Sequence, residues 1–451
     1  MTNILLITAD DMDGRTPGYA GGPPAATPHL DRLAAEGMAF RRGHVAIAVC
    51  QPSRSAIMTG MWPHRNGAQG FEPVHDGIGL FTDVLHENGY LAGILGKTDH
   101  LQPVHRFGWD TLVPMRELGL GRDPRRYADE AAAFLRGARE AGRPWFLMAN
   151  AHDPHRPFHG STAEREKWDE ADRGRYPAPS RSWAAEDVEV PGFLPDLPGV
   201  RTEYAEYLGS ARRCDDVVGA VLGALADSGY ASDTLVVFLS DNGMAFPFAK
   251  ANCYLRSTLT PLVVRWPGVT EAGTVESDAF VSSLDLFPTF CDALGVPAPD
   301  GLDGTSLLPL LRRDETAPRA RVFTVFHETS AKVRYEMRCV QDARWGYIWN
   351  AWSDGERTYR AENMDGLSWA AIADAATTSS PIAARASFYR YRTPEELYDL
   401  RADPNCLRNL IDHGGEAAVA ARSMRTVLRD WLVATGDPLA ARYPGPSTSD
   451  G

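Results

Sequence analysis

Short apolar runs alternate with segments of helical periodicity over the first two thirds of the chain. The apolar runs lie at 3–8, 91–95, 145–149, 235–240 and 261–266, and the helical patterns include 27–37, 202–228 and 284–294. Runs of this length without strict polar alternation are typical of strands buried on both faces. We therefore expect an α/β fold in which helices sandwich a large, mostly parallel sheet.

The pattern changes after residue 320. Three strand-like runs and one helical pattern follow, at 322–327, 335–341, 344–349 and 417–434. We expect residues 1–320 to form a catalytic α/β domain and residues 321–451 a smaller α+β domain with an antiparallel sheet that completes the substrate pocket. Segment 156–199 is rich in proline, tryptophan and charge and has no clear period. Because it is too long for a simple connector, we expect it to form a wall of the active site.

Acidic and amide side chains follow two of the predicted strands. Asp10 and Asp11 come after the first run, and Asp241 and Asn242 follow the run at 235–240. Ligands of parallel sheets bind beyond the carboxyl ends of the strands, where these residues are expected. Three carboxylates and an amide oxygen suit Ca²⁺ or Mg²⁺ better than zinc. Acids after strands also cap helices, but the two motifs together favour a metal site.

A cysteine motif lies between these acids in the sequence. Residues 50–60 read Cys-Gln-Pro-Ser-Arg-Ser-Ala-Ile-Met-Thr-Gly, and Cys50 stands at the start of a helical segment. A helix N-terminus attracts anions, and Arg54 adds a positive charge there. A buried structural cysteine is the alternative, but the Pro-Ser-Arg and Thr-Gly around Cys50 favour a functional residue.

Basic and imidazole side chains form three groups near strand ends, two after further strands and one just beyond Ser-Asp-Asn-Gly. They are Lys97 with His100, His152 with His155, and Lys250. Each alone is better interpreted as a solvated charge or a core histidine. Three such groups after strands of one sheet favour a shared catalytic site.

Composition and charge narrow the function classes. The 451-residue chain has a formal charge of −13, which argues against nucleic-acid binding but allows a local positive pocket for a small anion. No stretch approaches the roughly 20 apolar residues of a membrane span. The N-terminus lacks the features of a signal peptide, so we expect a cytoplasmic protein. The six cysteines show no paired spacing, which fits a reducing compartment.

Taken together, these motifs resemble those of type I, formylglycine-dependent sulfatases of the alkaline phosphatase superfamily. The resemblance extends from Asp10 to the Glu-Leu-Tyr-Asp-Leu segment at 396–400 and beyond it to Asp403-Pro404. It implies that a formylglycine-generating enzyme oxidises Cys50 to Cα-formylglycine, whose hydrated diol is the nucleophile. It also implies a Ca²⁺ ion, with Mg²⁺ as the alternative, on the modified Cys50 and the four metal-ligating candidates, Asp10, Asp11, Asp241 and Asn242.

The same resemblance implies roles for the basic residues. Arg54 and Lys97 would orient the diol and the sulfate, and His155 and Lys250 would contact the sulfate or the leaving group. His155 is the first choice for the proton donor. His100 stands three residues after Lys97, where the family usually places a histidine two residues after the lysine.

Within this family the chain is most similar to sulfamidases, which remove the N-sulfate of N-sulfoglucosamine. The narrower match consists of residues 152–156, residues 240–247, and Tyr335-x-Met337-Arg338 after His327-Glu328. It makes His152, Glu328 and Arg338 the candidates for contacts to a small sulfated saccharide, with a surface ion pair as the alternative for Glu328. Lys250 stands where sulfamidase-like proteins carry arginine and most other sulfatases carry lysine, and the two are not equivalent.

Three alternative functions remain open. The first is an O-sulfatase that acts on a sugar sulfate. The second is a phosphonate monoester or phosphodiester hydrolase, because related proteins use formylglycine and the same acids. The third is a silent binder of sulfated glycans, which would apply if Cys50 stayed unoxidised.

Overall fold

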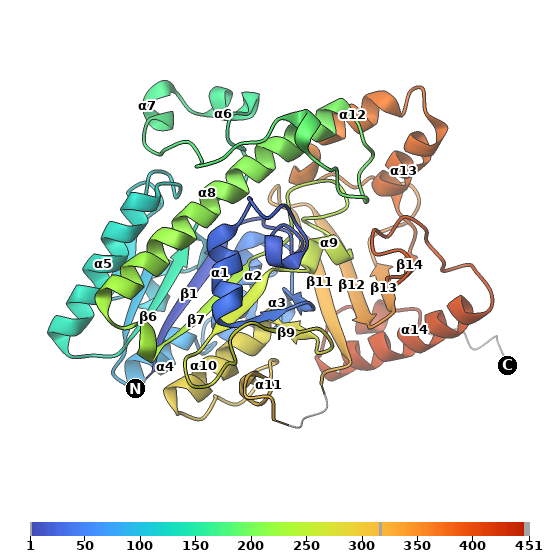
Figure 1. Cartoon of the computed structure of the whole chain (residues 1–451). Helices are drawn as coiled ribbons and strands as arrows, with labels where there is room; N and C mark the ends of the chain where they lie inside the picture. Colours follow the sequence, from blue (N-terminus) through green and yellow to red (C-terminus); the bar gives the residue numbers. More distant parts are fainter. Residues whose placement is uncertain (1, 315–317, 446–451) are drawn as a thin grey trace.

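An eight-stranded sheet forms the centre of the molecule (Figure 1). The computed structural model describes residues 2–314 and 318–445. In spatial order the strands are β5 (Thr111–Val113), β4 (Leu91–Leu95), β6 (Trp145–Asn150), β1 (Asn3–Ala9), β7 (Thr234–Ser240), β8 (Leu262–Arg265), β2 (Met38–Phe40) and β9 (Thr274–Glu276). The strands from β5 to β7 are all parallel, whereas β8 is antiparallel to both β7 and β2. The prediction of a mostly parallel sheet is confirmed.

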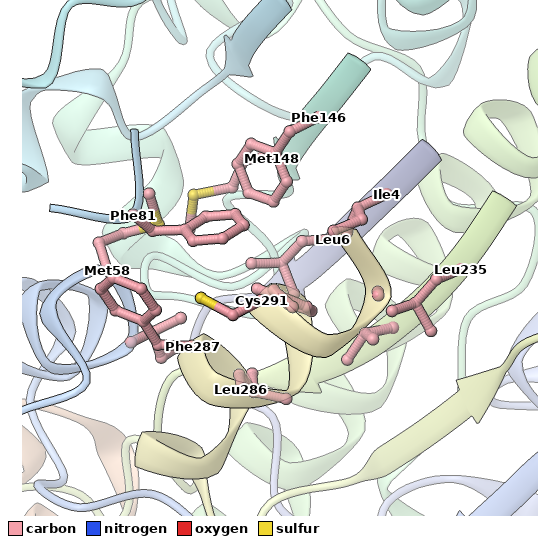
Figure 2. Packing of buried hydrophobic residues seen from close by; sticks show 14 of the residues in the cluster. Ile4, Leu6, Met58, Phe81, Phe146, Met148, Leu235, Leu286, Phe287 and Cys291 are labelled. Atoms are coloured by element: carbon pink, nitrogen blue, oxygen red, sulfur yellow. The ribbon is translucent and has the colours of Figure 1, made fainter. Parts of the chain in front are cut away.

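Helices cover both faces of this sheet, and β1 shows why. Successive side chains of a strand point to opposite faces. Leu5 and Ile7 pack in a cluster with α1, α5 and α8, whereas Ile4 and Leu6 pack with α2, α4 and α10 (Figure 2). The helices are α1 (Pro28–Glu36), α2 (Cys50–Thr59), α4 (Phe81–Glu87), α5 (Pro124–Ala141), α8 (Pro198–Ser228) and α10 (Leu286–Leu294). Both faces of β1 are therefore buried, which explains why its sequence is a largely apolar run.

A second, antiparallel sheet of four strands lies beside the first (Figure 1). Its strands are β11 (Arg321–Glu328), β12 (Arg334–Asp342), β13 (Trp345–Asn350) and β14 (Glu395–Asp399), and the helix α14 (Glu416–Ala434) packs against it. The expected antiparallel sheet and closing helix are present. The sequence did not predict β14 as a strand. The division into domains at residue 320 stays a prediction.

The shorter elements complete the description of the chain. They are β3 (Gly43–His44), β10 (Val281–Ser282), α3 (Pro63–Asn66), α6 (Thr162–Lys167), α7 (Glu170–Arg173), α9 (Leu255–Thr258), α11 (Leu308–Leu311), α12 (Leu367–Ala375) and α13 (Ser380–Tyr391). Segment 156–199 contains only α6, α7, one 3₁₀ turn and the start of α8, as its lack of periodicity indicates. Among the described residues no helix is both long and apolar enough to cross a membrane. All six cysteines are free.

Candidate active site

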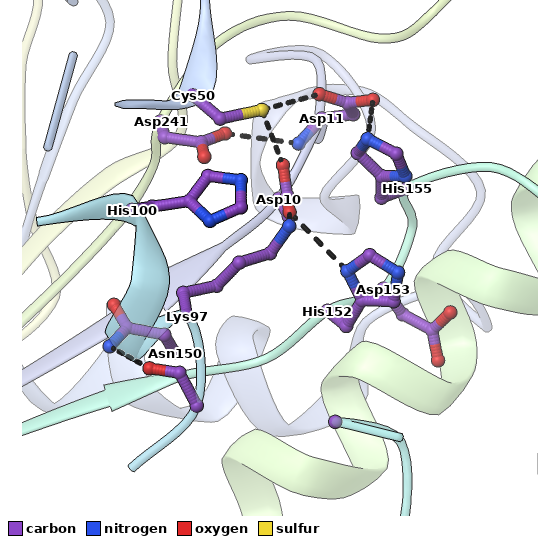
Figure 3. Close-up of polar contacts among 12 residues, drawn as sticks. Asp10, Asp11, Cys50, Lys97, His100, Asn150, His152, Asp153, His155 and Asp241 are labelled. Atoms are coloured by element: carbon purple, nitrogen blue, oxygen red, sulfur yellow. Dashed lines mark hydrogen bonds and ion pairs between the residues drawn. The ribbon is translucent and has the colours of Figure 1, made fainter. Parts of the chain in front are cut away.

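The carboxyl ends of four parallel strands bring the predicted polar residues together (Figure 3). Asp10 and Asp11 follow β1, Lys97 follows β4, the loop with His152 and His155 follows β6, and Asp241 and Asn242 follow β7. Helix α2 adds Cys50 as its first residue. The expectation that these strand ends share one edge is confirmed.

Three buried carboxylates form the centre of the site. Asp10, Asp11 and Asp241 are each 0% exposed. Burial, followed by the charge of Asp10, raises the pKa of Asp241 to about 7, and burial likewise raises the pKa of Asp11. Burial acts in the same direction on Asp10, but the Lys97 ammonium holds the pKa of Asp10 well below its usual range. The cluster therefore favours an additional positive charge.

Each carboxylate also has one cationic side chain beside it. The pairs are Lys97 with Asp10, Arg54 with Asp241 (Nη2 to Oδ2, 2.7 Å) and Lys250 with Asp11 (Nζ to Oδ1, 2.6 Å). Three negative and three positive charges cancel. A divalent cation would leave the cluster with a net positive charge, which suits an anionic group such as sulfate.

Among the described residues, two oxygen atoms of the cluster lack both a hydrogen-bond donor and a lysine or arginine beside them, in contrast to Asp10 Oδ2, which pairs with Lys97. Asp11 Oδ2 and Asn242 Oδ1 are buried and accept no hydrogen bond within the described part of the chain. Ligand atoms of Asp10, Asp11, Cys50 and His155 lie within 4.8 Å of one another. Asp241 Oδ1 accepts a hydrogen bond from the Asp11 backbone at 3.2 Å, and so lies against the same group. Buried oxygens without donors are what a hard cation such as Ca²⁺ would satisfy, so the residues fit the predicted metal site.

Cys50 lies among these charges and is 3% exposed. Its Sγ is 3.1 Å from Asp10 Oδ1 and 3.3 Å from Lys250 Nζ. Burial, followed by Asp10, raises the pKa of the Cys50 thiol well above its usual range. A protonated thiol is a poor nucleophile. This environment therefore suits a modified residue at position 50 better than an unmodified catalytic cysteine.

The loop after β6 holds two histidine rings against the acids. The rings of His152 and His155 stack with centroids 4.8 Å apart (Figure 3). His152 Nδ1 lies 3.5 Å from Asp10 Oδ2, and His155 Nε2 lies 4.0 Å from Asp11 Oδ2. Burial lowers the pKa of both rings well below the usual range. His155 Nδ1 is 2.5 Å from the Arg156 carbonyl oxygen, which fixes the ring with Nε2 toward the acids.

The residues that hold this loop were not predicted as functional from the sequence. Asp153 is 1% exposed and accepts hydrogen bonds from Arg122 Nε at 2.9 Å and Arg213 Nε at 2.6 Å. Arg122 Nη2 also donates to the carbonyl oxygens of His155 and Pro157. Arg122 lies in the turn before α5 and Arg213 in the middle of α8, and only the fold brings these two segments together. Asp153 within the His-Asp-Pro-His run was the one available signal.

Asn150 is a second residue whose contribution the sequence did not predict. Its Oδ1 accepts hydrogen bonds from Arg54 Nη1 at 2.6 Å and from Thr8 Oγ1 at 2.7 Å. Its Nδ2 donates to the carbonyl oxygen of Gly96 at 3.0 Å. Asn150 therefore orients Arg54 and connects three strand ends. The sequence feature that could have identified Asn150 is its place as a polar residue at the end of an apolar run, as for Asp10.

Three non-glycine residues of the site adopt left-handed backbone conformations. The φ angles are 71° at Asp11, 52° at Lys97 and 62° at Ala251, which follows Lys250. Such conformations are costly for most residues and gather at functional sites. They indicate that the surrounding structure determines where these side chains lie.

A cavity of about 680 Å³ opens above the acids. Its floor includes Asp11, Cys50, His155 and Lys250. The walls come from the segments around residue 71, residues 155–167 and the C-terminal region, and their lining residues are Phe71, His100, Arg156, Pro157, Ala163, Glu166, Lys167, Ala245, Ser330, Glu362 and Asp365. Segment 156–199 therefore contributes part of the wall, as expected.

Side chains of the C-terminal region hold the Lys250 loop. Asn363 Nδ2 donates to the Lys250 carbonyl oxygen at 2.5 Å, and Tyr359 Oη donates to the Ala251 carbonyl oxygen at 2.7 Å. Asn363 Nδ2 also donates to Tyr389 Oη at 2.7 Å. Residues more than 100 positions later in the chain therefore fix the backbone of a residue on the cavity floor.

The three predicted sugar-contact residues and His100 lie in different places. His100 lines the cavity, where its Nδ1 is 3.1 Å from Asp99 Oδ1. His152 lies beneath His155 and is 9% exposed. Glu328 is 6% exposed, and its carboxylate lies beside Gly70, away from the cavity lining. It forms no ion pair within the described residues, in contrast to the surface alternative.

Arg338 does not reach the cavity. It is 0% exposed, and its Nε lies 2.6 Å from Asp437 Oδ2. Alternation along β12 places Arg338 on the same face as Val340, which packs against α14. A guanidinium enclosed on that face has no exposed atom for a sugar, so the expected sugar contact of Arg338 is wrong for this structure.

Comparison with known proteins relates this geometry to a family. The family model described as Sulfatase matches residues 2–296, and the model described as N-sulphoglucosamine sulphohydrolase, C-terminal, matches residues 245–356. The human N-sulphoglucosamine sulphohydrolase is 32% identical over 97% of this chain and 91% of its own.

Solved structures of low sequence identity share the fold. BT4656, solved in complex with its substrate D-glucosamine-2-N,6-O-disulfate, aligns with a TM-score of 0.72 and 19% identity over 97% of this chain and 98% of its own. A phosphonate monoester hydrolase from Silicibacter pomeroyi aligns with a TM-score of 0.69 and 20% identity over 97% of each chain. These two likenesses concern the fold alone.

Proposed function

Because the chain belongs to the sulfatase family, we propose that it hydrolyses the N-sulfate of a small saccharide, with N-sulfoglucosamine as the substrate. The similarity to the human N-sulphoglucosamine sulphohydrolase along nearly the whole chain supports this substrate. An O-sulfated sugar is the second candidate, because Lys250 is the residue that most other sulfatases carry at this place.

One observation carries the proposal. Three buried carboxylates, balanced by three cations, surround Cys50 on the floor of a cavity. Oxygens without donors lie in the same cluster. This arrangement can hold a divalent cation and still attract a sulfate group, whose charge the three cations then face.

Cα-formylglycine at position 50 would supply a hydroxyl nucleophile, and a Ca²⁺ ion on Asp10, Asp11, Asp241 and Asn242 would polarise the sulfate. The residues of the chain provide the rest of the catalysis. Arg54 is held by Thr8, Asn150 and Asp241, so its guanidinium is already oriented. Lys97 and Lys250 stabilise negative charge that develops on the transferred group in the transition state.

His155 is our assignment for the proton donor to the departing nitrogen or oxygen. Its Nδ1 is held by the Arg156 carbonyl oxygen, and the ring lines the cavity. Because Nδ1–H donates to that carbonyl oxygen, Nε2 carries a proton only in the imidazolium form of the ring, which a bound sulfate would favour. In that form Nε2 is the atom that can protonate the leaving group. His152 packs against this ring and contacts Asp10, so it supports His155 and does not face the substrate.

The test is sulfate release from N-sulfoglucosamine by protein whose formylglycine content has been confirmed by mass. Glucosamine 6-sulfate, an aryl sulfate and an aryl phosphonate serve as parallel substrates. Release from N-sulfoglucosamine and not from glucosamine 6-sulfate is the expected result. Release only from the 6-sulfate would replace the N-sulfatase assignment by an O-sulfatase, and preference for the phosphonate would overturn the proposed reaction.

A further inference from the structure

Glu362 is a carboxylate of the cavity wall that forms no ion pair with any residue the structure describes. It lies in a 3₁₀ turn, Glu362–Met364, between β13 and α12. Its Oε2 is buried and has no hydrogen-bond partner within residues 2–314 and 318–445. The carboxylate forms no ion pair with any residue in these ranges, although it lines the cavity with His155 and Lys250. A buried acceptor without a donor is unfavourable unless a ligand supplies the donor.

The backbone of Glu362 is fixed to both segments that carry the cavity floor. Arg156 Nη1 donates to the Glu362 carbonyl oxygen at 3.0 Å, and Arg156 is the neighbour of His155. The next residue, Asn363, donates to the Lys250 carbonyl oxygen at 2.5 Å. Direct hydrogen bonds thus set the position of the Glu362 backbone relative to the segments that carry His155 and Lys250. A group placed in this way can read the geometry of a bound substrate.

Glu203 strengthens this connection. Its Oε1 accepts from Arg156 Nη2 at 2.8 Å, and its Oε2 accepts from the Ser368 backbone at 2.7 Å. A side chain at Gly366 would collide with both Glu203 and Arg156, so the chain passes close to this pair. The Arg156 charge is therefore used by Glu203 and is not available to neutralise the Glu362 carboxylate.

The other carboxylates of the cavity wall differ from Glu362. Asp365 is exposed and pairs with Arg360. Glu166 is exposed, so water can solvate its charge. Glu362 alone among the wall carboxylates in the described ranges combines a cavity position with a buried oxygen that lacks a donor.

We propose that Glu362 determines substrate specificity by accepting a hydrogen bond from a hydroxyl group of the sugar whose sulfate lies beside Cys50. This inference rests on the proposed function. An ionised carboxylate only accepts hydrogen bonds, and the polar groups of the sugar away from the reacting sulfate are hydroxyl donors. The bond is charge-assisted, so it contributes more to binding than a neutral one. An aryl sulfate has no hydroxyl to offer and does not use Glu362.

The test compares Glu362→Gln with the wild type on N-sulfoglucosamine and on 4-nitrophenyl sulfate. We expect KM for N-sulfoglucosamine to rise on the order of tenfold, with kcat and both constants for the aryl sulfate unchanged. Unchanged aryl sulfate hydrolysis also demonstrates that the variant is folded. An equal rise in KM for both substrates, or no rise for either, would overturn the inference.

Glu328→Gln is the matched comparison, because Glu328 also has a buried oxygen without a donor but lies off the cavity lining. We expect a smaller change in KM for the sugar than with Glu362→Gln, and the reverse order would assign the sugar contact to Glu328 instead.

Inhibition of aryl sulfate hydrolysis by glucosamine separates this inference from the proposed substrate. If the wild type hydrolyses the aryl sulfate but not N-sulfoglucosamine, the proposed substrate is wrong. The inhibition constant of glucosamine then tests whether Glu362 contacts the sugar. Weaker inhibition of Glu362→Gln than of the wild type supports the sugar contact, and equal or absent inhibition overturns it.

Discussion

Two buried arginine–aspartate pairs, one in each part of the molecule, have nearly the same local geometry. Arg54 and Asp241 lie 2.7 Å apart at the edge of the large sheet, and Arg338 and Asp437 lie 2.6 Å apart under the second sheet. The side chains of both pairs are at most 1% exposed. From the sequence, both arginines were candidates for contacts to the substrate or its sulfate.

The surroundings of the two pairs differ. Near Arg54 there are two further carboxylates, oxygens without donors and a cavity. Arg338 instead donates to both oxygens of Asp437 and to the carbonyl oxygens of Phe326 and Met337. Burial and pairing therefore do not identify a catalytic site. A cluster of charged groups with incomplete hydrogen bonding beside a cavity does.

The largest effect is expected at Cys50, beside the first pair. Cys50→Ser should abolish multiple turnover, because a serine would stay trapped as its sulfate ester, whereas the diol can expel sulfate. Sulfate released per enzyme molecule measures this, and the intact mass reveals the trapped ester. An unfolding midpoint equal to that of the wild type controls for folding, and sustained turnover by the variant would contradict the formylglycine mechanism.

Removal of divalent cations should change the site around Arg54 and Asp241 and should leave the Arg338–Asp437 pair unchanged. A chelator is expected to lower activity by about 100-fold or more, because the site then loses the ion that would polarise the sulfate. Added Ca²⁺ should restore activity and raise the Tm of the wild type.

Asp11→Asn should lose this thermal response to Ca²⁺, whereas Arg338→Leu should keep it. A full response in Asp11→Asn would exclude Asp11 as a ligand.

Arg338→Leu should act on stability and not on substrate binding. It leaves Asp437 buried without its partner, so the free energy of unfolding is expected to fall by about 3–5 kcal/mol. Urea unfolding measures this loss. The KM of the folded fraction for the sugar should equal that of the wild type. A raised KM would support the predicted sugar contact of Arg338. The double variant Arg338→Leu with Asp437→Leu should recover much of the lost stability, because neither charge is then buried alone.

The smallest effect concerns His327, which neighbours Arg338. His327 is 1% exposed, and burial, followed by Arg338, lowers its pKa well below the usual range. The unfolded chain takes up a proton near pH 6.5, which the folded chain does not. Stability should therefore fall as pH decreases below about 6.5, by up to about 1.4 kcal/mol per pH unit. In urea unfolding, His327→Leu should make the free energy of unfolding depend less on pH. An unchanged pH dependence in this variant would exclude His327 as its source.

Much of the site could be predicted because it depends on strand ends. A polar residue after a buried apolar run lies at the carboxyl edge of a parallel sheet, so Asp10, Lys97 and Asp241 were expected to converge. Asn150 also lies at the end of an apolar run, but it is uncharged and was not predicted as a site residue. Periodicity also gave β1, β4, β6, β7 and α8 to within a few residues, because burial on both faces leaves a clear pattern.

The remaining residues depend on contacts that no local pattern contains. Arg122 lies in the turn before α5 and Arg213 in α8, and they meet at Asp153 only in the folded chain. Glu362 lies in a turn whose place is set by Arg156 and Asn363. Arg338 failed as a sugar contact because a motif does not reveal which face of an antiparallel strand meets a helix. The catalytic roles of the site residues and the cytoplasmic location stay predictions.

The hydrogen bonds from Tyr359 and Asn363 to the Lys250 loop have a consequence for synthesis of the chain. A ribosome makes the chain from its N-terminus, so the loop is complete long before the side chains that hold it exist. During that interval the large sheet can form, but the Lys250 loop lacks the two hydrogen bonds that Tyr359 and Asn363 donate to it. A message cut short before codon 359 would therefore yield a protein that contains every catalytic candidate but lacks part of the support of its cavity floor.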